Sequence, residues 1–286
     1  METREKMAVS STRDAKKLFR RLGTCSHTLF YMLNREFGHN HVTRERAVDP
    51  LAGGILQKGH QCGMLWGASL AAGAEACRRC DDLNQAMRIA ILATQNLMRS
   101  FDQRENTVNC REITRCDFSS RLSFAKYFFS GRFLHCFDLA EKWAPEAIEA
   151  ALESLAVPPE DSKNAPTLNQ PVLNCASEVA RKMGASDEEM VMVAGFAGGL
   201  GLSGNACGAL ATTIWMGTLS WCRKYEEKSS MKNPNAKATL KSFEDFIGKR
   251  MLCTEIAGRE FSSIDEHSTF IRIGGCASLI EKLAEK

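Results

Sequence analysis

The sequence lacks several features that would assign it to a familiar class of protein. Residues 1–21 contain no continuous apolar core, so we expect no secretory signal and predict a cytoplasmic protein. A net charge of +3 over 286 residues is too small to predict binding to nucleic acid. No stretch of the chain alternates between polar and apolar residues at a period of two, so β-strands are not expected.

Sequence patterns of common enzyme classes are also missing. The chain has no Walker phosphate loop, no serine nucleophile elbow, no H-E-x-x-H metal motif and no suitably placed pair of carboxylates. Between Glu189 and Arg223 there is no charged residue, and this run is long enough to span a bilayer. Glycines interrupt it, and a related stretch earlier in the chain carries Lys58 and His60. We therefore expect a buried hairpin and no membrane span.

Cysteine, in contrast, is abundant, with twelve residues in a chain that shows no secretory signal. Such usage favours free thiols or metal ligands over a secreted disulfide framework. The cysteines also repeat, because ten of them occupy equivalent places in two halves of the chain. The five pairs are Cys25 with Cys175, Cys62 with Cys207, Cys77 with Cys222, Cys110 with Cys253, and Cys136 with Cys276. Cys80 and Cys116 have no counterpart.

A glycine-rich stretch precedes the central cysteine of each half. Leu51–Gly63 and Phe196–Gly208 both contain a pair of glycines, the second of which lies eight residues before Cys62 or Cys207. Glycine permits positive φ angles and close approach of the backbone, so each stretch predicts a tight turn. The cysteine that follows should lie in the first turn of a long helix. Unpaired N–H groups and the helix dipole would favour its thiolate form there.

The repeat predicts two helical domains. We expect the first over residues 1–156, a proline-containing polar linker over 157–171, and the second over 172–286. Apolar residues recur at helical spacing, for example from Met87 to Phe101. The predicted fold class is therefore all-α, with two tandem helical bundles that pack as a pseudo-dimer.

Several helices can be placed from this spacing. One amphipathic helix is predicted over residues 16–36, and central helices over 61–80 and 205–225. A helix in the second half should present an apolar face that extends to Met251. A final helix should contain Cys276.

The cysteine pattern resembles a known family, the redox-active proteins named for the motif C_GCAxxG_C_C. Asn174-Cys175-Ala176 is similar to the first cysteine of that motif, and Cys207-Gly208-Ala209 is similar to its Cys-Gly-Ala core. Cys253 and Cys276 match the third and fourth cysteines. This resemblance covers residues 172–286.

The first half, over residues 20–155, resembles a diverged second copy. It keeps the glycine of the family motif as Gly67 but has Met64 in place of the alanine. The second half has the alanine and replaces that glycine with Thr212. These departures affect the packing of the central helix more than the cysteine set.

The resemblance implies a helical domain with four functional cysteines, in a family linked to redox and metal contexts and, through a related domain, to iron–sulfur binding. The predicted cofactor-binding residues are Cys175, Cys207, Cys253 and Cys276, which are also the predicted metal ligands, and their counterparts Cys25, Cys62, Cys110 and Cys136. No catalytic residue is predicted, and enzymatic activity is left open.

Thiolates ligate soft metals and iron–sulfur clusters and also react in disulfide exchange, so three interpretations are open. The leading one is a cytoplasmic electron-transfer protein with an iron–sulfur cluster. In the second, pairs such as Cys207 and Cys253 cycle between dithiol and disulfide. In the third, the protein handles zinc or is stabilised by it. A redox partner protein of unknown identity is implied, and a homo-oligomer is possible.

The second half has the less crowded turn and the cleaner set of cysteines, so we expect it to carry the chemistry. Bulk at Lys58 and His60 in the first turn should weaken a site there. Cys77-Arg-Arg-Cys80 forms a C-x-x-C pair at the end of a predicted helix, not after a strand, and is interpreted as incidental. The loop histidines at His60 and in His39-Asn-His41 are interpreted mainly as solvated.

Overall fold

The structure is a computed structural model that describes residues 15–156 and 171–285. Within these ranges the chain forms helices and two isolated antiparallel bridges, with no strand. The all-α prediction is therefore confirmed. All of the predicted linker except Pro171 lies outside the described residues. Below, "first half" means residues 15–156 and "second half" means 171–285.

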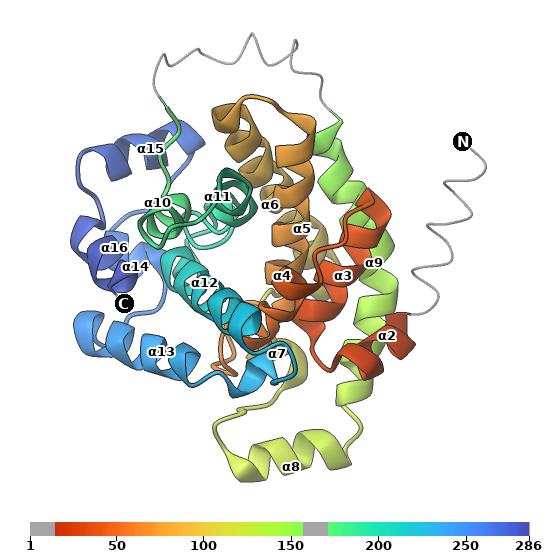
Figure 1. The fold of residues 1–286 in the computed structure, drawn as a ribbon. Coiled ribbons are helices and arrows are strands. Elements are labelled where there is room, and N and C mark those ends of the chain that lie inside the picture. The colour runs from red at the N-terminus through yellow and green to blue at the C-terminus, as the bar shows by residue number, and fades with distance from the viewer. Residues whose placement is uncertain (1–14, 157–170, 286) are drawn as a thin grey trace.

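Figure 1 shows the first half in red to light green and the second half in green to blue. The elements of the first half are α2 (Ala15–Leu22), α3 (Cys25–Phe37), α4 (Val42–Arg46), the 3-10 helix η1 (Asp49–Leu51), α5 (Gly63–Arg79), α6 (Leu83–Glu105), α7 (Cys110–Thr114), α8 (Arg121–Phe129) and α9 (Phe133–Leu155). Those of the second half are α10 (Cys175–Lys182), α11 (Asp187–Ala194), α12 (Gly208–Lys224), the 3-10 helix η3 (Ser230–Lys232), α13 (Pro234–Ile247), α14 (Cys253–Ala257), α15 (Ile264–Arg272) and α16 (Ala277–Ala284).

Three helix predictions need correction. The helix predicted over residues 16–36 is two helices, because Gly23 adopts a φ of 87° and Thr24 then caps α3 by accepting a hydrogen bond from the N–H of His27. The predicted final helix is α16, which begins at Ala277, so Cys276 is its N-cap residue and not part of the helix. The backbone of Cys276 is in the left-handed region, with a φ of 58°. Helix α13 ends at Ile247, so Met251 lies beyond it.

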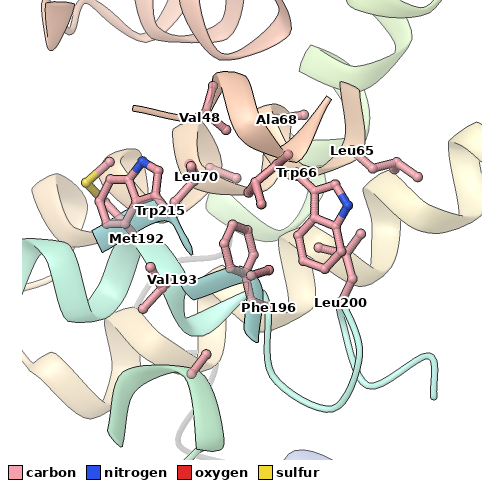
Figure 2. Close-up of a cluster of buried hydrophobic side chains, with 14 of the residues drawn as sticks. Val48, Leu65, Trp66, Ala68, Leu70, Met192, Val193, Phe196, Leu200 and Trp215 are labelled. Atoms are coloured by element: carbon pink, nitrogen blue, oxygen red, sulfur yellow. The ribbon is translucent and has the colours of Figure 1, made fainter. Parts of the chain in front are cut away.

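The two halves pack against each other as predicted. Helix α11 lies against α5 and α6, and α12 lies against α4 and η1. Figure 2 shows the core of this interface, where the rings of Trp66 and Phe196 meet edge to face with their centroids 4.8 Å apart. Glycine makes the approach possible, since a Cβ added to Gly73 would lie 2.6 Å from the Cα of Met192. Close packing of this kind supports the pseudo-dimer.

Both glycine-rich turns are left-handed. Residues 53–57 have φ angles between 50° and 73°, and residues 198–202 between 59° and 83°. Glycine adopts such angles freely, whereas each other residue type costs about 1–2 kcal/mol. Three of the five residues in the first turn and two in the second are not glycine, so both turns are strained by the packing around them. The expected positive φ angles are present, but they extend beyond the glycines.

The second glycine of each pair has a specific role. A Cβ on Gly54 would lie 2.3 Å from the backbone nitrogen of His60, and one on Gly199 would lie 2.5 Å from the carbonyl oxygen of Asn205. The chain therefore folds back across this glycine before it reaches the central cysteine. No other residue fits there without moving the backbone.

The uncharged run over residues 190–222 is divided between α11, the left-handed turn and α12. None of the described helices is both long enough and apolar enough to cross a bilayer.

Candidate functional site: two four-cysteine pockets

Backbone hydrogen bonds hold two cysteines side by side in each half. Cys62 and Cys207 are the N-cap residues of α5 and α12, and Cys110 and Cys253 begin α7 and α14. In the first half the N–H of Cys62 donates to the carbonyl of Val108 over 2.8 Å, and the N–H of Cys110 donates to the carbonyl of His60 over 2.7 Å. The second half has the equivalent bonds, from Cys207 to the carbonyl of Met251 over 2.9 Å and from Cys253 to the carbonyl of Asn205 over 2.6 Å. The duplication has preserved this pairing in detail.

The left-handed turn then brings in the first cysteine of each half. Cys25 and Cys175 begin α3 and α10, directly after the N-cap residues of those helices. The N–H of Gly53 donates a hydrogen bond to the sulfur of Cys25, and the equivalent N–H of Gly198 donates to the sulfur of Cys175. The turn thus presents a backbone donor to sulfur at the same place in both halves.

The starts of the central helices supply further donors. The N–H of Met64 donates to the sulfur of Cys62, and the N–H groups of Ala209 and Leu210 donate to the sulfur of Cys207. These are the unpaired N–H groups of a helix's first turn. Each half therefore has at least two of its sulfurs bonded by backbone N–H groups.

In the first half the four cysteines line one cavity of about 330 Å³, which we call the first-half pocket. Its walls are largely aromatic, formed by Phe19, Phe118, Tyr127, Phe133 and Phe137. The Oη atom of Tyr127 lies 3.5 Å from the Sγ atom of Cys136. One wall residue, Met231, comes from η3 of the second half.

In the second half the four cysteines also line one cavity, the second-half pocket, but it is far smaller. Its volume is about 10 Å³, which is room for about one water molecule. Phe261, Phe270 and His267 form part of the wall, and His267 is only 2% exposed. Burial lowers the pKa of this histidine to about 4, so its ring is neutral at pH 7.

The thiols of the second-half pocket are protonated at neutral pH. Burial raises the pKa of Cys207 and of Cys253 to about 12 and also raises the pKa of Cys175 and of Cys276. The expectation that a helix start would favour the Cys207 thiolate is therefore wrong. The N–H groups of Ala209 and Leu210 do lower its pKa, but the loss of hydration outweighs them.

The first-half pocket differs in one thiol. The pKa of Cys25 is lowered, mainly by a hydrogen bond with the thiol of Cys62 and further by the N–H groups of Gly53 and Ser26. The same bond raises the pKa of Cys62. Burial raises the pKa of Cys110 and brings that of Cys136 to about 11. Cys25 is thus the thiol most easily ionised in this pocket.

The donor set suits a soft metal or a cluster, since each pocket offers four thiols and an otherwise mostly apolar wall. Among the described residues, no group of three or more His, Cys, Asp or Glu side chains is arranged to hold one metal ion. A single zinc ion with sulfurs at 2.3 Å requires those sulfurs to lie about 3.8 Å from one another. The cysteines would have to move inward to bind a lone ion.

The other cysteines do not line either pocket. Cys77 and Cys80 lie at the C-terminal end of α5, and Cys222 is buried in α12. Cys116 is buried close to Cys110 but outside the cavity, and it accepts a hydrogen bond from the hydroxyl of Ser123 over 3.7 Å.

The histidines singled out in the sequence lie elsewhere. His39 contacts the buried carboxylate of Glu75 over 2.9 Å, and His41 lies 3.3 Å from Glu188. Both contacts lie outside the two cysteine pockets, although Glu188 is close enough to Cys77 to raise the pKa of that thiol. The interpretation of both rings as solvated is too simple. His60 lines a separate cleft between the halves.

Sequence reasoning missed three pocket residues, namely Tyr127, Met231 and His267. Tyr127 lies in an aromatic run that did not indicate which ring faces the cysteines. Met231 comes from the opposite half, and His267 sits in α15 with no motif around it. Only the tertiary fold brings them to the sulfurs.

Comparison with known proteins agrees with the internal repeat. The sequence profile of the family described as "Putative redox-active protein (C_GCAxxG_C_C)" matches residues 24–149 and 173–286. No curated protein and no solved structure matches the chain. The two profile matches cover most of the chain, one in each half, and include all eight cysteines of the two pockets. The protein therefore belongs to the C_GCAxxG_C_C family of redox-active proteins, as a tandem duplicate.

Proposed function

We propose that the protein is an electron-transfer protein in which the four cysteines of the first-half pocket bind an iron–sulfur cluster. When bound, such a cluster supplies one-electron transfer. The observation that carries the proposal is the convergence of four thiols from four separate elements, with backbone N–H groups bonded to Cys25 and Cys62. Four sulfurs exceed what a disulfide needs, and N–H donors to sulfur are a known means of raising a cluster's reduction potential.

The sizes of the two cavities favour the first half. A multinuclear cluster needs space between its ligands, and the first-half pocket has about 330 Å³ against about 10 Å³ in the second. This preference is opposite to the one drawn from sequence, where bulk at Lys58 and His60 suggested a weaker first site. Those two residues line the cleft between the halves and not the first-half pocket, so their bulk does not crowd the sulfurs.

A second candidate is thiol–disulfide chemistry at Cys25 and Cys62. Their hydrogen bond and the lowered pKa of Cys25 favour it, because the thiolate is the nucleophile in disulfide exchange. In this reaction the Cys25 thiolate attacks a disulfide of a partner and releases one thiolate. Cys62 then loses its proton and displaces the second, so that the partner is reduced by two electrons and the pair is oxidised.

One measurement separates these functions. Protein purified under anaerobic conditions is analysed for iron, acid-labile sulfide and zinc per chain, and its absorption near 400 nm is recorded. Iron and sulfide in equal amounts, lost together in Cys25→Ser, are the expected result. Colourless protein that gains a Cys25–Cys62 disulfide on mild oxidation would favour the dithiol. Zinc at one equivalent per chain, without sulfide, would instead support a structural metal.

We further propose a cytoplasmic location. All twelve cysteines are free thiols in the structure. Cysteines in such number are kept reduced in cytosolic compartments, whereas secreted proteins pair them.

A further inference from the structure

A third cavity, which we call the interdomain cleft, lies between the two halves and separate from both cysteine pockets. It has a volume of about 710 Å³, within the range of small-molecule sites. The first half contributes Lys58, Gly59, His60, Asn109, Arg111 and Glu112, and the second contributes Asn205, Glu244 and residues 248–252. Neither the proposed cluster nor the dithiol uses any of these side chains.

Cationic side chains outnumber carboxylates in the interdomain cleft. Four cations line it, Lys58, Arg111, Lys249 and Arg250, against the carboxylates of Glu112 and Glu244. Lys58 pairs with Glu244 over 3.1 Å, and Arg111 reaches Asp117 outside the cleft over 3.4 Å.

The two cations that the second half contributes to the cleft have no acidic partner in the part of the chain that the structure describes. Lys249 forms no ion pair with any residue that the structure describes, and Arg250 donates only from Nε to the carbonyl of Ile247, over 3.1 Å. The guanidinium edge of Arg250 is thus available to a ligand. Arginine offers paired N–H donors that match phosphate oxygens, and lysine adds a point charge.

His60 adds a polar group to the first-half wall of the cleft. Its ring is half-buried and has no hydrogen-bond partner among residues 15–156 and 171–285. A ring nitrogen of His60 can therefore donate a hydrogen bond to a ligand that lies among the cations of the cleft.

We propose that the interdomain cleft binds a phosphate-bearing small molecule of up to nucleotide size, held between Arg111 of the first half and Lys249 and Arg250 of the second. The cleft also adjoins both pairs of central cysteines. The carbonyl groups of His60 and Asn205 accept the hydrogen bonds that hold Cys110 and Cys253. A ligand in the cleft would touch the residues that position cysteines in both halves at once.

The test is direct binding to the full chain, reduced and freed of metal so that its outcome does not depend on the proposed cluster. Sodium pyrophosphate and ADP are titrated separately into the protein at low ionic strength by calorimetry. We expect saturable binding of at least one probe. Tighter binding of ADP identifies a nucleotide ligand, and equal or tighter binding of pyrophosphate identifies a smaller phosphate compound; both results support the cleft.

Variants locate the binding. The double variant Lys249→Gln with Arg250→Gln should raise the dissociation constant at least tenfold. Lys237→Gln, an exposed lysine on α13 outside the cleft, should leave it unchanged. All three substitutions replace exposed side chains, so the fold should survive, and circular dichroism checks this. Wild-type protein that binds neither probe at millimolar concentration, or a double variant that binds as wild type does, would overturn the proposal.

Discussion

The hydroxyl of Tyr127 lies 3.5 Å from the sulfur of Cys136. This contact ties α8 to the first-half pocket. The helix has no buried residue, and Leu122 and Phe129 on it are 81% and 87% exposed. Figure 1 shows α8 standing apart from the rest of the bundle. Tyr127 is therefore the residue through which an otherwise exposed helix reaches a cysteine of the pocket.

Replacing this tyrosine should change the acidity of Cys136. The hydrogen bond from Tyr127 lowers the pKa of Cys136, which burial holds near 11. In Tyr127→Phe the pKa should rise further, because a bond worth about 1 kcal/mol is lost. Peptide-resolved alkylation of reduced, metal-free protein at alkaline pH should show Cys136 reacting about fivefold more slowly. Tyr31→Phe, outside the pocket, serves as the control, and an unchanged Cys136 rate would show that the contact has no influence.

The two cavities predict an order of importance among the cysteines. Cys62→Ser should remove most of the iron and sulfide from anaerobically purified protein, because it deletes a ligand of the roomier pocket. Cys207→Ser should remove less, although the sequence alone predicts the reverse order. Cys222 is buried but lines neither pocket, so Cys222→Ser should change neither the iron content nor the sulfide content.

The reverse order, with Cys207→Ser the more severe, would assign the cluster to the second-half pocket. That result would mean that the second half opens when it is loaded. Equal losses from both variants would indicate two equivalent sites.

The close crossing of α5 and α3 should depend on Gly67. A Cβ at this position would lie 2.1 Å from the carbonyl oxygen of Ser26, so Gly67→Ala should destabilise the fold by about 1–3 kcal/mol. Gly217→Ala is the matched control, since a Cβ there meets nothing within 4 Å and alanine favours the helix by about 1 kcal/mol. The urea concentration at the midpoint of unfolding should fall for Gly67→Ala and rise for Gly217→Ala. A midpoint that rises in Gly67→Ala as well would contradict the close approach of α5 and α3.

Acid should destabilise the protein through His267. Its pKa is about 4 in the fold, below the ordinary value of 6.5, so the unfolded chain binds the proton more readily. The stability from the neutral ring is fully present above pH 6.5 and is lost as the pH falls to about 4. The loss is up to about 3 kcal/mol, at 1.36 kcal/mol per pKa unit.

Urea unfolding at pH 7 and pH 4.5 tests this. His267→Asn should lose less stability between the two pH values than wild type, whereas His135→Asn, whose ring is 48% exposed, should lose as much as wild type. Identical losses in all three proteins would show that the buried ring does not titrate in this range.

The repeat and the helices could be predicted because each has a local cause in the sequence. Spacing alone matched Cys62 with Cys207, and apolar periodicity located α5 and α12. The break at Gly23 was missed because the apolar pattern continues across it. The helix ends there because one residue, Gly23, adopts a positive φ angle, and the pattern does not report that angle.

The chemistry of the site was harder to predict, because burial is a property of the whole fold. For Cys207, local sequence indicated a helix start and hence a thiolate. Burial raises the pKa of this thiol by more than the N–H groups of the helix start lower it. The size of each cavity likewise depends on residues that come from distant segments. Sequence could group the cysteines but could not say how much space they enclose.

Because of Met231, the wall of the first-half pocket is completed only some time after its cysteines have been synthesised. The ribosome makes Cys136, the last of this pocket's cysteines, 95 residues before Met231. At about 5–20 residues per second, translation leaves an interval of about 5–20 s in which all four thiols exist without that wall. In the second-half pocket only Leu279 follows the last cysteine, by three residues, so the corresponding interval is under about 1 s. In the newly made chain, the four thiols of the first-half pocket are thus present before η3 adds its one wall residue.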